Sequence, residues 1–129
     1  MSQNLKVGIV GLGAIGLEIA KTIDSEKLPN MSLVSVSSRD LTKAQNKLET
    51  LKSKPKLTNI DETVILSDII IESAPAAIFD EIAEATIEAG KILIPASVGA
   101  LLPRMHLIDR AKETGAKVIV PTGALIGLD

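Results

Sequence analysis

The sequence feature that most constrains the fold of this chain is a glycine-rich run near its N-terminus, Gly11 to Gly16, which reads GLGAIG. A short apolar segment, Lys6 to Val10, leads into this run, and isoleucines follow it at helical spacing (Ile15, Ile19 and Ile23). This change of pattern predicts a buried strand, a tight turn and a helix. In that context G-x-G-x-x-G indicates a turn that binds a dinucleotide.

Each glycine has a separate role in such a turn. Gly11 permits the tight turn, Gly13 removes a side chain that would keep a pyrophosphate from the backbone, and Gly16 lets the helix settle against the strand. The first N–H groups of the helix then point at the phosphates, with the positive end of the helix dipole behind them. The alternative is a glycine-rich turn without a chemical role.

Composition supports a parallel sheet and excludes several classes of protein. The chain has 129 residues, enough for one domain with a substantial core. Apolar residues make up 46 %, with one Phe and no Trp or Tyr, so an Ile, Leu, Val and Ala core is expected, as in a parallel sheet covered on both faces. Because aromatic stacking residues are scarce and the net charge is −2, nucleic-acid binding is not expected. The absence of cysteine excludes disulfides and thiolate metal sites.

The N-terminal residues do not read as a targeting segment. They run directly into the first predicted strand, with no basic segment leading into an apolar core. No apolar run approaches the length that spans a membrane. We expect a cytoplasmic protein that does not contact a membrane.

The rest of the sequence alternates between strand and helix patterns, with Gly90 and Gly115 placed to end helices. Right-handed crossovers arrange such strands as an α/β fold, a Rossmann-type doubly wound parallel sheet in the order 3-2-1-4-5-6 with helices on both faces. Residues 1–129 would form this single domain. Beyond the first strand and helix, we expect strands over residues 31–37, 56–59, 68–72, 91–95 and 117–120, helices over 42–52, 76–89 and 103–114, and a single helical turn over 61–66.

The end of the second predicted strand bears on the choice of cofactor. NAD enzymes usually place an Asp or Glu there, on the ribose hydroxyls. Here the strand ends in Ser37, Ser38, Arg39 and Asp40. A hydroxyl and a guanidinium suit a 2′-phosphate, so NADP is slightly favoured over NAD. Asp40 comes late for the NAD role and can cap the next helix instead, and Arg39 can also stack on adenine or simply be solvated.

Three further loops fall at the carboxyl edge of the predicted sheet, where ligands bind in such folds. They are small-residue loops, each with a hydroxyl: Ser73, Ser97 and Thr122. They offer no general acid or base. Glu72 ends a strand and receives no role, and His106, the only histidine, is expected on a helix surface. No His, Asp or Glu set has metal-ligand spacing, so no metal site is predicted.

With these segments placed, the sequence resembles the L-aspartate dehydrogenase family. The resemblance covers essentially the whole chain and rests on KVGIVGLGAIG, IIIESAP, SVGALLP and above all VPTGALIGLD. It implies an oxidoreductase that oxidises L-aspartate to iminoaspartate with NAD(P), or aminates oxaloacetate reductively in reverse, and a link to NAD biosynthesis.

The resemblance also implies which residues bind the cofactor. Family members often read EAAS where this chain has Glu72 to Pro75, and the proline removes one backbone donor. Position by position, the resemblance assigns Gly11, Gly13, Ala14, Ile15 and Gly16 to the pyrophosphate, Ser38 and Arg39 to the adenosine ribose, and Ala74, Pro75, Ser97, Val98, Gly99 and Ala124 to the nicotinamide half.

The family pattern continues past GLD into a second domain that carries the catalytic histidine and most substrate contacts. Because the sequence given stops at Asp129, we expect that domain to be absent, no catalytic residue in this chain, and no activity from the chain alone. A dicarboxylic amino-acid substrate would then bind only with the missing domain. An apolar face beside Leu101, Leu125, Ile126 and Leu128 would favour a homo-oligomer or a partner subunit.

Two other interpretations remain open at this point. The first is a stand-alone NAD(P)(H)-binding module without catalysis, which acts as a regulator or as one subunit of a split enzyme. The second is a relative of homoserine dehydrogenase or dihydrodipicolinate reductase, which fits the glycine motif but not PTGALIGLD.

Overall fold

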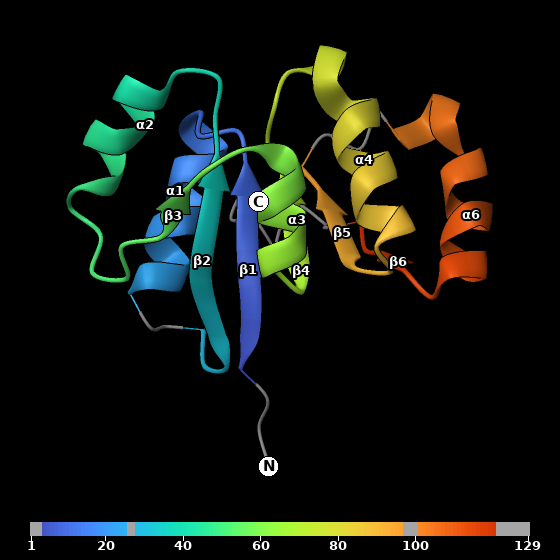
Figure 1. Cartoon of the computed structure of the whole chain (residues 1–129), viewed down its shortest axis with the longest axis horizontal. Coiled ribbons are helices and arrows are strands. Elements are labelled where there is room, and N and C mark those ends of the chain that lie inside the picture. The colour runs from blue at the N-terminus through green and yellow to red at the C-terminus, as the bar shows by residue number, and fades with distance from the viewer. Residues whose placement is uncertain (1–3, 26–27, 97–100, 121–129) are drawn as a thin grey trace.

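The computed structural model describes residues 4–25, 28–96 and 101–120, and it places all strands of that part in one parallel sheet. The strand order is β3-β2-β1-β4-β5-β6, which confirms the predicted topology (Figure 1). The strands are β1 Leu5–Val10, β2 Met31–Ser37, β3 Lys56–Leu57, β4 Ile69–Glu72, β5 Ile92–Pro95 and β6 Lys117–Val118.

A helix follows each of β1 to β5 along the chain, and several helix bounds differ from the predicted ones. The helices predicted over 76–89 and 103–114 begin with 3-10 turns, so α4 and α6 start three residues later than expected. The segment predicted as a single turn is a seven-residue helix, α3, because Asn59 caps it by accepting a hydrogen bond from the Glu62 N–H at 2.8 Å. The second helix, α2, ends at Leu48, four residues earlier than expected. The helices are α1 Ala14–Asp24, α2 Leu41–Leu48, α3 Ile60–Leu66, α4 Phe79–Glu88 and α6 His106–Thr114, with 3-10 turns at Ala76–Ile78 and Leu102–Arg104.

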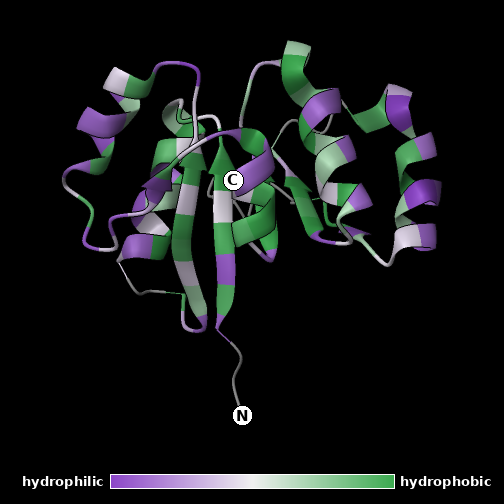
Figure 2. Ribbon diagram, viewed as in Figure 1, coloured by the Kyte–Doolittle hydropathy of each residue, from purple (hydrophilic) through white to green (hydrophobic). Residues whose placement is uncertain are grey.

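Helices cover both faces of the sheet, as predicted. In Figure 1, α1 lies behind the sheet, whereas α3 and α4 lie in front of it. Two apolar cores result, and both consist mainly of aliphatic side chains. Figure 2 shows apolar colour over much of the central strands, interrupted by pale and purple segments, whereas α4 and α6 carry a polar outer side. The first core joins β1, β2 and β4 to α1 and α2, and the second joins the end of β1, β4 and β5 to α3, α4 and α6.

Close packing brings α3 against the middle of the sheet. A Cβ built on Gly8 of β1 would lie 2.3 Å from the Ser67 Oγ, so only glycine allows this approach. The buried hydroxyls of Ser35 and Thr63 are hydrogen-bonded at 2.8 Å across the same contact. This packing holds the segment before α3 at the carboxyl edge of the sheet, next to the end of β2.

The turns after α4 and α6 follow the predicted chemistry. Gly90 and Gly115 adopt φ values of +72° and +82°, a left-handed conformation that favours glycine. Leu101, expected on an exposed apolar face, is instead buried in the second core with 3 % exposure, while the neighbouring Leu102 is 67 % exposed. Within the described ranges, no helix has the length and apolar character needed to cross a bilayer.

Candidate functional site

A cavity of about 890 Å³ opens at the carboxyl edge of the sheet, between the ends of β1 and β2 on one side and β4 on the other. Residues far apart in the sequence meet in its wall. The lining consists of residues 10–13, 37–41, 57–60 and 73–75, with Lys43, Ala44 and Lys47 from α2, and Ile78 and Glu81.

The glycine turn forms the floor of this cavity, and the backbone of neighbouring segments packs tightly against it. Gly11 has a φ of +95°, and a Cβ built on it would lie 2.3 Å from the backbone oxygen of Ser73. A Cβ on Gly16 would lie 2.3 Å from the Gly11 oxygen. The Gly11 N–H donates to the Ser37 oxygen at 2.8 Å, which ties the turn to the end of β2. Both glycines are therefore required by the fold itself.

Gly13 differs from the other two glycines because its side-chain position faces open space. A Cβ built there would meet no atom within 4 Å, and Gly13 lines the cavity. Gly13 is also the N-cap of α1, and no side chain caps this helix end. Ala14 and Ile15, the first two helical residues, are exposed. Uncapped N–H groups at a helix start suit an anion, so the turn fits a pyrophosphate.

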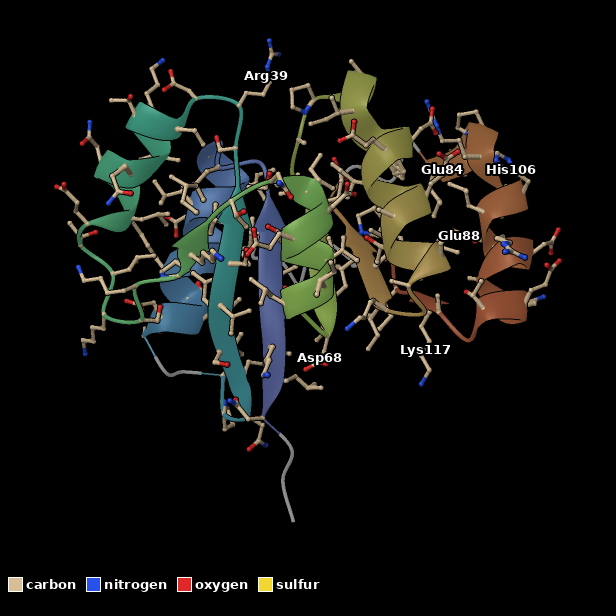
Figure 3. The ribbon with its side chains drawn as sticks, in the orientation of Figure 1. Arg39, Asp68, Glu84, Glu88, His106 and Lys117 are labelled. Carbon is tan, nitrogen blue, oxygen red and sulfur yellow. The ribbon has the colours of Figure 1, made fainter. Side chains whose placement is uncertain are left out.

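Ser38 and Arg39 line the same cavity beyond the glycine turn. Arg39 is exposed and extends from the loop after β2 (Figure 3). The Asp40 carboxylate accepts a hydrogen bond from the Lys43 N–H at 3.0 Å and caps α2, which confirms the capping interpretation. The cap leaves a hydroxyl and a guanidinium as the groups that extend from the end of β2.

Two further cations border the cavity, and sequence reasoning missed both as site residues. Lys43 and Lys47 lie on α2, and the Lys47 Nζ donates to the Leu12 carbonyl oxygen at 2.9 Å. The available signal was the spacing of basic residues, since Lys43 and Lys47 lie four positions apart within the predicted helix and follow Arg39. Positions four apart share one face of a helix. The segment 57–60 was missed as well, because only the packing of α3 brings it to the cavity.

The loop after β4 forms the opposite wall. Ala74 and Pro75 line the same cavity as Arg39, so the structure brings these predicted site residues together. Glu72 is buried, with 1 % exposure, and its carboxylate accepts a hydrogen bond from the Ala74 N–H at 3.0 Å. This contact orders the wall of the cavity. The predicted residues Ser97, Val98, Gly99 and Ala124 lie outside the described residues.

His106 begins α6, far from Arg39, and does not line the cavity (Figure 3). It is exposed, as the sequence indicated. In the described part of the chain, no group of three or more His, Cys, Asp or Glu side chains could hold a metal ion.

Comparisons with known proteins agree with this geometry. A curated L-aspartate dehydrogenase from Bradyrhizobium diazoefficiens is 41 % identical over 99 % of this chain and 45 % of that protein. L-aspartate dehydrogenase 3 from Bordetella bronchiseptica is 36 % identical over 98 % of this chain and 47 % of that protein. The chain thus spans about half the length of these curated relatives.

Among solved structures, biliverdin reductase from Synechocystis in complex with biliverdin and NADP+ matches with a TM-score of 0.81 and 22 % identity, over 96 % of this chain and 40 % of that one. This likeness concerns the fold alone. Residues 11–121 match the family described as homoserine dehydrogenase, NAD binding domain. The curated relatives confirm the resemblance to L-aspartate dehydrogenases. The chain belongs to the L-aspartate dehydrogenase family and contains the NAD-binding domain that the family model describes.

Proposed function

We propose that this chain is the NAD(P)-binding half of an oxidoreductase that acts on L-aspartate. A second domain would supply the catalytic groups and most of the contacts to the substrate. The observation that carries this proposal is that Gly13, with its open side-chain position, lines the same cavity as Ser38 and Arg39. The names of the curated relatives support L-aspartate as the substrate.

The chain's own residues would hold and orient the cofactor. The pyrophosphate would lie against Gly13 and the uncapped start of α1. The adenosine would lie against the loop after β2, and the nicotinamide half would extend toward the wall formed by Ala74 and Pro75. When bound, the cofactor supplies a hydride acceptor for the α-carbon of the amino acid. These residues would fix the position of the cofactor, and holding a reactant in place lowers the entropic cost of reaching the transition state.

Arg39 is proposed to select NADP over NAD. Its guanidinium offers paired donors to a 2′-phosphate, and Asp40, the nearest carboxylate in sequence, is engaged as the cap of α2. A capped carboxylate is less available to the ribose hydroxyls that NAD presents.

Calorimetric titration with NADH and NADPH tests both parts of this proposal. We expect NADPH to bind more tightly, and Arg39→Ala to weaken NADPH by about tenfold while changing NADH by less than about twofold. Lys21→Ala is the matched control, since Lys21 is an exposed cation on α1 outside the cavity. If the wild-type chain binds neither nucleotide, the proposed function is wrong; if Arg39→Ala weakens both equally, only the 2′-phosphate assignment is wrong.

The chain alone is proposed to bind cofactor without turnover and to associate with itself or with a partner. A base that takes the amine proton is also needed for oxidation of L-aspartate. Incubation of the purified chain with L-aspartate and NADP+, followed by the absorbance of reduced nicotinamide, should show no product. Product formation would place catalytic groups within these residues.

Sedimentation over a range of concentrations tests association, and a monomer throughout would exclude self-association.

A further inference from the structure

Lys47 connects α2 to the glycine turn. Its Nζ donates to the Leu12 carbonyl oxygen at 2.9 Å, across a separation of 35 residues in the sequence. Lys47 lies in the last turn of α2, and both Lys47 and Leu12 line the cavity. The contact therefore joins the adenosine side of the site to the turn that would receive the pyrophosphate.

The first three residues of the glycine turn, residues 11–13, form hydrogen bonds with three different elements. The Gly11 N–H donates to the Ser37 oxygen of β2 at 2.8 Å, and the Gly13 oxygen accepts from the Leu17 N–H of α1 at 2.9 Å. Lys47 of α2 holds the carbonyl oxygen of the middle residue. Because a peptide unit is planar, fixing the Leu12 oxygen also fixes the direction of the Gly13 N–H. Gly13, on one side of this peptide, has the backbone freedom that such a hydrogen bond restrains.

The charge of Lys47 has a second effect. An ammonium at the turn adds positive potential at the place where phosphate would bind. The start of α1 offers backbone N–H donors and no capping side chain, so Lys47 would add a full positive charge to those donors. Arg39 lies two residues beyond the end of β2, whereas Lys47 contacts the turn. The two cations thus act at different parts of a dinucleotide.

We infer that Lys47 is a positioning residue for the pyrophosphate of the cofactor. It orders the glycine turn before binding and adds charge beside the phosphates, and neither effect depends on the 2′-substituent. This inference rests on the proposed function. It separates Lys47 from Arg39: loss of Lys47 weakens every ligand that contains the pyrophosphate, whereas loss of Arg39 weakens every ligand that contains the 2′-phosphate.

Four ligands distinguish these roles in calorimetric titrations of the full chain: NADH, NADPH, ADP-ribose and adenosine 2′-monophosphate. With Lys47→Met we expect NADH, NADPH and ADP-ribose to lose about tenfold in affinity each, and adenosine 2′-monophosphate to lose less than about twofold. Arg39→Ala should weaken NADPH and adenosine 2′-monophosphate instead. Lys47→Arg keeps the charge and a donor and should restore most of the affinity. Lys21→Met, outside the cavity, is the neutral control.

The outcomes separate the inference from the function beneath it. If wild type binds the dinucleotides and Lys47→Met leaves ADP-ribose unaffected, the inference is wrong and the proposed function stands. If Lys47→Met weakens all four ligands equally and lowers the melting temperature of the ligand-free chain, Lys47 is only structural and the inference is again wrong. If wild type binds none of the four, both fail together.

Discussion

The two halves of the sheet use their charged side chains differently. In the half with β4, β5 and β6, Arg110 of α6 pairs with Glu88 of α4 at 2.6 Å, and Arg104 pairs with Asp80. In the half with β1, β2 and β3, Arg39 and Lys43 make no ion pair with any described residue. The paired cations of the one half hold α4 against α6 and the turn before it. In the other half Lys56 of β3 pairs with Glu62 of α3, whereas Arg39 and Lys43 lie at the cavity without an ion-pair partner among the described residues.

The glycines divide in the same way. Gly90 and Gly115 in the second half only end helices. In the first half, Gly11 and Gly16 allow close packing and Gly13 opens space for a ligand. The difference indicates that substitutions in the second half should change stability alone. At the cavity, substitutions should change binding where the side-chain position is open, as at Gly13, and stability where packing or a helix cap is lost, as at Gly11 and Asp40. Four predictions test this division.

The largest expected effect is on stability, at Phe79. This is the only aromatic residue of the chain; it is fully buried in the second core, and the Arg104 guanidinium lies 5.4 Å from its ring centroid. Phe79→Ala should lower the free energy of unfolding by about 3–5 kcal/mol, because it removes a large buried side chain and leaves a cavity. Urea denaturation followed by circular dichroism measures this.

A matched surface position serves as the control for Phe79. Ile65 is 73 % exposed, and Ile65→Ala should change the free energy of unfolding by less than about 0.5 kcal/mol. The folded fraction of Phe79→Ala should bind cofactor as wild type does. Weaker binding by that folded fraction would contradict the division between the halves.

The glycine turn offers a sharper comparison, between Gly11→Ala and Gly13→Ala. At Gly11 the added Cβ would meet the Ser73 oxygen at 2.3 Å and the φ is +95°, so strain alone should cost about 1–3 kcal/mol of stability. At Gly13 the added Cβ meets nothing within 4 Å, so stability should change by less than about 1 kcal/mol. Cofactor affinity should nevertheless fall by about tenfold or more at Gly13, because the methyl group would occupy the phosphate position.

Thermal melts and calorimetry on the same two proteins provide the measurements. A Gly13→Ala variant that binds cofactor as wild type does would show that the pyrophosphate lies elsewhere.

A smaller effect is expected at the cap of α2. Asp40→Ala removes the acceptor for the Lys43 N–H, and should cost about 1 kcal/mol of stability. Asp40→Asn keeps a capping oxygen and should retain most of that stability. Equal losses in both variants, measured by urea denaturation, would mean that the negative charge and not the cap is what matters.

The smallest effect concerns pH. A hydrogen bond from Arg110 lowers the pKa of Glu88 below its ordinary value of 4.5. A lowered folded-state pKa contributes stability that is present above the unfolded pKa and is lost as the pH falls through the folded pKa. Since Glu88 is exposed, this contribution should be small. An NMR titration of the Glu88 carboxyl carbon should show its pKa rise toward the ordinary value in Arg110→Met, and an unchanged value would mean that the pair does not form in solution.

Local patterns in the sequence predicted much of the fold. The bounds of β2 agree with the prediction residue for residue, and the strand order follows from alternating patterns and right-handed crossovers. The early end of α2 could not be predicted in this way. The Asp24 carboxylate accepts hydrogen bonds from the N–H groups of Lys52 and Ser53, both at 2.8 Å, and this distant contact draws the chain out of the helix.

The cavity shows the same limit. Gly13, Ser38 and Arg39 could be predicted, because a turn between strand and helix and the end of the next strand are recognisable in sequence. Lys47 could not, because its partner Leu12 lies 35 residues away and only the placement of α2 brings the two together.

The sequence by itself determined the type of fold, the strand order and the turn that would bind phosphate, since these depend on residue periodicity and on the backbone freedom of glycine. Only the tertiary structure decided which cations reach that turn, that Glu72 is buried beneath the loop wall, and that Gly13, unlike Gly11 and Gly16, faces open space. The physical reason is that hydrogen bonds, burial and steric contact depend on distances between segments, and those distances exist only once the helices have packed on the sheet.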